Sequence, residues 1–131
     1  MGKPTNEYLV ISRGQWDASA SPDEVQRAID QFYVWYEGNL AAGRMKRGSR
    51  LTPECKLVSA RSITDGPFTE TKEVVGGYWF IVAESLEDAA ALAAENPCLA
   101  FGLVLEIRPL DSEKAQATAV TNETPLAWRS R

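Results

Sequence analysis

The chain has 131 residues, of which 44% are apolar, and it carries a formal net charge of −4 at pH 7. This length suits one domain whose core is thin enough that burying a further face against a partner would stabilise it. No block of Lys and Arg is large enough to displace the counterions of a nucleic acid, so no nucleic-acid partner is expected.

The sequence also lacks the usual features of membrane and secreted proteins. No run of about 18 apolar residues predicts a membrane span. The N-terminus has no charged stretch followed by an apolar segment, as a secretory signal would. Cys55 and Cys98 lie far apart and form no CxxC pattern, so a reduced, cytoplasmic setting is expected.

Histidine is absent from the whole chain, and this narrows the possible chemistry. Without imidazole, Ser-His-Asp and Cys-His catalysis are excluded. Ordinary zinc and non-haem iron sites also depend on imidazole. No tight acidic cluster suggests a Mg²⁺ site. We therefore expect neither a metal nor a cofactor.

The first elements are a strand and a capped helix. The apolar run Tyr8–Ile11 predicts a buried strand over residues 8–13, and its two apolar faces favour a central position in a sheet. Ser21 can cap a helix whose first position is Pro22, and Glu24 can complete a capping box. Apolar residues at spacings of three and four then predict a helix that ends at Gly43.

The middle of the chain predicts three strands. Residues 44–51 and 56–63 are interpreted as modest strands, and the short basic run 44–50 as a solvated strand face rather than a phosphate site. Residues 74–82 form the strongest strand, which is β-branched, aromatic and apolar on both faces. The pair Gly76-Gly77 within it indicates a bulge or the close approach of another backbone.

The last part predicts a helix, a strand and a tail. Ser85 can cap a second helix over about residues 86–95, which Asn96-Pro97 ends. Residues 103–109 alternate as a half-exposed strand does. Residues 1–110 would then form the domain. Residues 111–131 are polar and rich in Ala and Thr, and they predict an extended or mobile tail.

This order of elements predicts an α+β fold of the ferredoxin-like type. Right-handed crossovers place both helices on one face of a mostly antiparallel sheet. The strand at 74–82 makes the other face too apolar for water, so we expect it to pack on the same face of a second copy. The result would be a homodimer, a dimeric α/β barrel. The alternative is a monomer whose open face the C-terminal tail covers.

One segment resembles a known family. Residues 64–73 read TDGPFTETKE, and the strand with Gly76 and Gly77 follows directly. This segment resembles the hallmark of the DGPF group, small bacterial proteins related to the YCII family, and the likeness extends over about residues 7–110. The wider YCII group is associated with a His–Asp pair, from which enzymatic function has been inferred. This chain matches the Asp at Asp65 and has no His.

The candidate site centres on Asp65, which has two interpretations. It can be a turn residue whose carboxylate accepts backbone N–H bonds. It can instead be an acid or base held at the mouth of a dimer cleft, where burial would raise its pKa. Further candidates share proximity to this segment: Lys72 and Glu73 for catalysis, and Phe68, Arg61, Gly76, Gly77 and Tyr78 for ligand binding.

Three functions fit this pattern. The first is a small-molecule enzyme that uses Asp65 as acid or base. The second is a module that binds a small ligand or regulates without chemistry. The third is an interaction protein in which side chains fill the cleft. The three differ in whether a cleft of several hundred Å³ exists and in whether Asp65 is partly buried in it.

Overall fold

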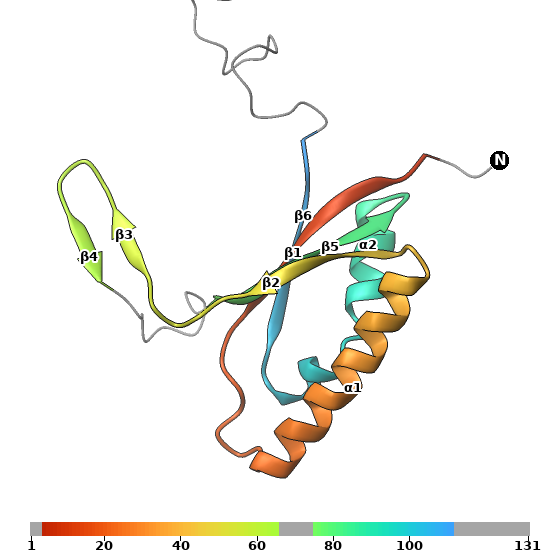
Figure 1. Cartoon of the computed structure of the whole chain (residues 1–131), viewed down its shortest axis with the longest axis horizontal. Helices are drawn as coiled ribbons and strands as arrows, with labels where there is room; N and C mark the ends of the chain where they lie inside the picture. The colour runs from red at the N-terminus through yellow and green to blue at the C-terminus, as the bar shows by residue number, and fades with distance from the viewer. Residues whose placement is uncertain (1–3, 66–74, 112–131) are drawn as a thin grey trace, which may run out of the picture.

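The computed structural model describes residues 4–65 and 75–111 (Figure 1). In chain order the elements are β1 (Asn6–Arg13), α1 (Pro22–Ala41), β2 (Met45–Arg50), β3 (Lys56–Val58), β4 (Ile63–Asp65), β5 (Val75–Ala83), α2 (Leu86–Ala93), the 3-10 helix η2 (Pro97–Phe101) and β6 (Val104–Pro109). None of the helices in these ranges combines the length and the apolar character needed to cross a membrane.

The main sheet has four strands in the order β2-β5-β1-β6, and every neighbouring pair is antiparallel. With the β3–β4 hairpin set aside, the chain runs strand, helix, strand, strand, helix, strand. This is the ferredoxin-like arrangement, so the predicted α+β fold is confirmed. The central position predicted for the first strand is confirmed as well, since β1 lies between β5 and β6.

The beginning and end of α1 follow from its sequence. The Ser21 hydroxyl accepts a hydrogen bond from the Glu24 amide at 3.1 Å, and the Glu24 carboxylate accepts one from the Ser21 amide at 3.1 Å. These two bonds satisfy donors that the first turn would leave unpaired. Gly43 follows the helix with a φ of 77°, a conformation that favours glycine.

The core lies between the two helices and one face of the main sheet. Trp79 on β5 packs against Phe32 and Tyr36 of α1, with ring centroids 5.5 and 5.9 Å away. Val10 and Ile81 are completely buried. The apolar spacing of α1 therefore predicted its buried face correctly. No helix of the described residues lies on the other face of the sheet, which we call the open face (Figure 1).

The edge strand β2 contains a bulge at Gly48. The pairing with β5 shifts between Lys46 and Ser49, and the Gly48 amide donates to the Tyr36 hydroxyl at 3.2 Å. A Cβ on Gly48 would lie 2.0 Å from the Tyr78 carbonyl oxygen. Only glycine allows the backbone to come this close.

Residues 56–63 differ from the predicted single strand. They belong to a hairpin in which β3 and β4 pair only with each other. The reversal is stabilised by bonds between Ser59 and Ser62: the Ser59 amide donates to the Ser62 carbonyl at 2.9 Å, and the Ser62 amide donates to the Ser59 hydroxyl at 3.3 Å. Serine side chains that bond nearby backbone groups favour turns over strands.

Candidate functional site

Asp65, the predicted centre of the site, is the last residue of β4. Its side chain is 75% exposed, and its Oδ1 accepts a bond from Lys56 Nζ at 2.5 Å. These two residues are cross-strand partners in the hairpin. Among the described residues, Asp65 is therefore a solvated member of an ion pair with Lys56.

Arg61 is the other predicted residue before the strong strand that the structure describes. Arg61 lies in the turn between β3 and β4 and is exposed. The hairpin that carries Arg61 and Asp65 shares no strand pairing with the main sheet. Three further candidates, Phe68, Lys72 and Glu73, lie outside the described residues.

The predicted residues on β5 have separate roles. A Cβ on Gly77 would lie 2.9 Å from the Ser49 carbonyl oxygen, so the close approach expected at this pair exists at Gly77. Gly76 has no such neighbour, since its Cβ would meet Ser12 Oγ at 3.9 Å, but it is the residue skipped where the pairing of β1 with β5 shifts, as at a bulge. Tyr78 projects from the open face, opposite to Trp79, as the alternation of the strand predicted. Of these three, Tyr78 is the residue whose side chain can contact a ligand on that face.

The open face has a half-buried apolar centre. Leu9 and Ile11 of β1 lie directly opposite Phe80 and Tyr78 of β5, and all four side chains are partly exposed. The rings of Tyr78 and Phe80 meet edge to face with centroids 6.0 Å apart. The sequence predicted that this face would be apolar, and the described strands have that character.

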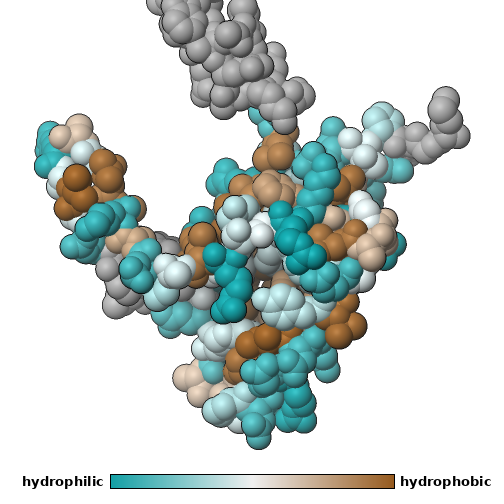
Figure 2. Space-filling view, in the orientation of Figure 1, coloured by the Kyte–Doolittle hydropathy of each residue, from teal (hydrophilic) through white to brown (hydrophobic). Residues whose placement is uncertain are grey.

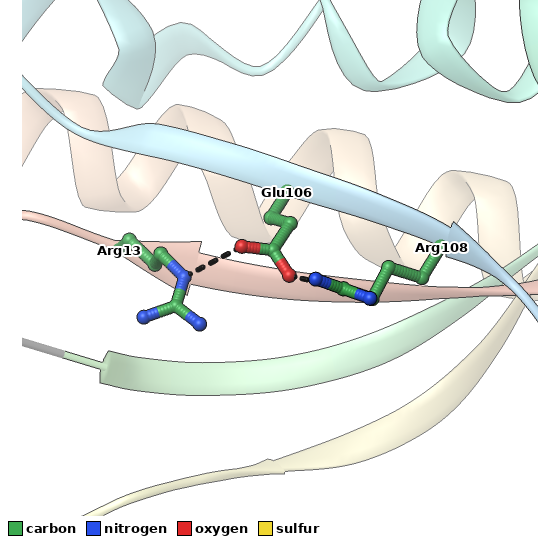
Figure 3. Close-up of polar contacts among 3 residues, drawn as sticks. All are labelled: Arg13, Glu106 and Arg108. Atoms are coloured by element: carbon green, nitrogen blue, oxygen red, sulfur yellow. Dashed lines mark hydrogen bonds and ion pairs between the residues drawn. The ribbon is translucent and has the colours of Figure 1, made fainter. Parts of the chain in front are cut away.

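A charged cluster lies beside this apolar centre, and sequence reasoning did not assign it to the site (Figure 3). Glu106 Oε1 accepts a bond from Arg13 Nε at 2.9 Å, and Glu106 Oε2 accepts one from Arg108 Nε at 2.5 Å. The side chains of Arg13 and Glu106 are 29% and 30% exposed, and that of Arg108 is 69% exposed. Glu106 therefore binds one arginine through each carboxylate oxygen, and of the two Arg108 extends into solvent.

These contacts fix the charge state of the cluster. The bond from Arg108, and then that from Arg13, lower the pKa of Glu106 from its usual value of 4.5. The bond to Glu106 in turn raises the pKa of Arg108. Glu106 is thus held in its charged form, and its bond to Arg108 Nε orients that guanidinium.

The register of β1 and β6 explains why these residues meet. Leu9 is opposite Arg108 and Ile11 is opposite Glu106. The alternation of residues 103–109 already placed Glu106 and Arg108 on one side of a strand. Arg13 comes from a strand more than ninety positions earlier (a separation of 93). Only the pairing of the two strands, which the sequence did not show, brings it into the cluster.

The described surface includes the following two hollows. One, of about 490 Å³, lies between α1, α2 and the start of β2, and is lined by Val34, Trp35, Gly38, Asn39, Arg44, Leu92 and Glu95. The other, of about 290 Å³, lies at one end of the open face beside the Glu7–Lys46 ion pair. Neither is lined by Asp65. Within residues 4–65 and 75–111, no group of three or more acidic or cysteine side chains could hold a metal ion.

The fold and the site define a class: small α+β proteins with a ferredoxin-like sheet, two helices on one face and an exposed apolar face with charged groups. The model of the YCII-related domain family matches residues 7–111, which is most of the chain. The chain belongs to the YCII-related domain family. No curated protein matches it closely enough to be reported as a relative.

Proposed function

We propose that this protein is a homodimeric member of the DGPF group that binds a small organic anion between two open sheet faces. The observation that carries this proposal is the position of Arg108. The Arg108 side chain is 69% exposed, and its guanidinium is bonded to Glu106 beside an apolar surface. An oriented guanidinium next to apolar side chains suits a ligand with a carboxylate at one end and an apolar body.

The apolar side chains on the open face support the dimer. Leu9, Ile11, Tyr78 and Phe80 form a continuous apolar strip across the two central strands. Such a strip is the feature that normally marks an interaction surface on a soluble domain. A two-fold pairing of this face with itself would cover both strips at once.

The arrangement of Arg108 also favours binding in a water-excluded cleft. The Nε of Arg108 donates a hydrogen bond to Glu106. Among the described residues, its two terminal nitrogen atoms make no hydrogen bond. Covering these donors without an acceptor would cost free energy. A bound carboxylate can accept from both terminal nitrogens in a single plane.

Catalysis with Asp65 as acid or base is the second candidate. The observation that favours it is the position of the hairpin, which lies on the same side of the sheet as the open face (Figure 1). Asp65 could then meet a ligand in the assembled dimer. In the single chain it is exposed and paired with Lys56, so binding has the stronger support.

Thermal-shift measurements with matched compounds test the binding function. Benzoate and hexanoate should raise the melting temperature, whereas benzyl alcohol and hexanol at equal concentration should not. A ligand at about 100 times its Kd stabilises by about 2.7 kcal/mol. Arg108→Ala should abolish the shift, and Arg27→Ala, which removes an exposed arginine from α1, should preserve it. Equal shifts with acids and alcohols would contradict anion recognition.

We also expect a dimer in solution, with twice the 14.4 kDa mass of one chain. Light scattering after gel filtration measures this mass. Product analysis then separates the two candidates. Unchanged ligand after prolonged incubation with the wild type supports the binding protein. Conversion that Asp65→Asn abolishes, without loss of the thermal shift, would favour the enzyme.

A further inference from the structure

The β3–β4 hairpin exposes apolar side chains that the rest of the described chain does not cover. Val58 and Ile63 are cross-strand partners, and they are 74% and 66% exposed. Leu57, on the other face of the hairpin, is 55% exposed. We call residues 51–65 the arm. Figure 2 shows the arm clear of the rest of the body, with hydrophobic residues on its surface.

The arm is too small to be stable through its own bonds. Its two strands have three residues each and pair only with one another. A two-stranded hairpin in water is at best marginally stable, and it needs a third strand or a packing surface. An exposed pair such as Val58 and Ile63 therefore indicates a surface that is covered in the assembled protein.

The position of the arm indicates which surface covers it. The arm leaves the main sheet directly after β2 and extends on the side opposite to α1 (Figure 1). The open face is on this same side. Between the arm and the open face is free space, which is visible in Figure 2. A molecule that packs on the open face is therefore placed to contact the arm as well.

A second copy of this chain supplies both complementary surfaces. Its open face offers the apolar strip and, at the edge, Val104, which is 58% exposed. Under two-fold symmetry each arm reaches the partner's face while its own face receives the partner's arm. The same pairing would then cover both the apolar side chains of the arm and the apolar strip, which the described residues of one chain leave exposed.

We propose that the arm crosses to the second subunit and packs its Val58–Ile63 face on the partner's open sheet face, so that Asp65 belongs to the partner's cleft. This inference rests on the dimer of the proposed function. The exposed carboxylate of Asp65 would then lie beside the ligand surface of the other subunit. Each cleft would then consist of Arg108 from one chain and Asp65 from the other.

The native cysteines allow a direct test. Cys55 lies in the arm and is exposed, whereas Cys98 is buried. A benzophenone maleimide attached to Cys55 in the full chain should, after illumination, give a band of twice the chain mass on a denaturing gel. Peptide mapping should place the adduct on β1, β5 or β6 of the other subunit. The matched control is Cys55→Ser with Asp30→Cys, which moves the label to an exposed position on α1 and should give no such band.

The outcomes separate this inference from the proposed function. A dimeric mass with adducts only within one chain, or on the partner's helices, would overturn the arm exchange and leave the dimer intact. A monomeric mass would overturn both. Loss of anion binding in the Arg108 variant concerns the proposed function alone, and it does not alter the adduct pattern expected here.

A pair of valine substitutions provides a second measurement. Val58→Lys changes an arm residue that is 74% exposed, and Val34→Lys changes a residue of α1 that is 77% exposed. If neither valine met a partner, both changes would be equally tolerated. The exchange predicts that Val58→Lys raises the dimer dissociation constant at least about tenfold, whereas Val34→Lys leaves it unchanged. Sedimentation at several concentrations measures this, and equal constants for the two variants would contradict the exchange.

Discussion

Glu106 Oε2 lies 2.5 Å from Arg108 Nε, although the two residues are only two positions apart on β6. The contact is possible because residues i and i+2 of a strand project from the same face. Arg13 approaches the same carboxylate from β1, so that Glu106 joins two strands of the open face. The lowered pKa of Glu106 is the measurable consequence of this geometry.

We predict that Glu106 contributes to the pH dependence of stability on the acid side. A carboxyl group with a lower pKa in the folded than in the unfolded chain stabilises the fold above its usual pKa, here 4.5. This stabilisation is lost as the pH falls below 4.5 through the folded value. The difference in urea midpoint between the wild type and Glu106→Gln should therefore be larger at pH 6 than at pH 3. Equal differences at the two pH values would contradict this contribution of Glu106.

The two neighbouring glycines of β5 should respond differently to alanine. A Cβ at Gly77 would lie 2.9 Å from a backbone oxygen of β2, and the edge strand cannot move away without losing its pairing. Gly77→Ala should lower the free energy of unfolding by about 1–3 kcal/mol. A Cβ at Gly76 would make only ordinary van der Waals contacts, so Gly76→Ala should change the free energy of unfolding by less than about 0.5 kcal/mol. Chemical denaturation of both variants measures this, and equal losses would contradict the packing described.

The two thiols should differ in reactivity. Burial raises the pKa of the Cys98 thiol to about 11, and thiolate is the reactive form. A thiol reagent at pH 8 should modify one cysteine of the native protein rapidly, and peptide analysis should identify it as Cys55. Cys98 should react only in denaturant. Modification of both at similar rates in the native state would show that the region around η2 opens easily.

The capping box of α1 should have a measurable effect on stability. Ser21→Ala removes the acceptor of the Glu24 amide, which should cost about 1 kcal/mol in the free energy of unfolding. Ser19→Ala, two residues earlier in an exposed turn, is the control and should be neutral within about 0.5 kcal/mol. A similar effect of the two substitutions would mean that the cap does not set the start of the helix.

The sequence predicted the sandwich better than it predicted the arm, and the reason is the kind of signal involved. Ser21 and Ser85 cap their helices through local bonds, so the pattern and the structure depend on the same few residues. The reversal at Ser59 and Ser62 has neither Gly nor Pro. Its hydroxyl bonds form only once the chain has turned, so the segment resembled one continuous strand.

The candidate site shows a similar division. Tyr78 could be assigned to the open face from the alternation of one strand. Arg13 and Glu106 could not be paired, since that requires the register of two strands far apart in the sequence. Asp65 was singled out from a family resemblance, which indicates a position along the chain and carries no information on exposure. Its ion pair with Lys56 depends on the hairpin that the sequence did not reveal.

The bulge at Gly48 has a consequence for how molecules of this protein can meet. It interrupts the outer edge of β2, where Lys46 and Arg47 are exposed. At the opposite edge, β6 ends in Pro109, which has no amide hydrogen to donate. Charges, a bulge and a proline are the features that prevent one sheet from continuing into the next. Growth of a ribbon of sheets from chain to chain through these edges is therefore disfavoured.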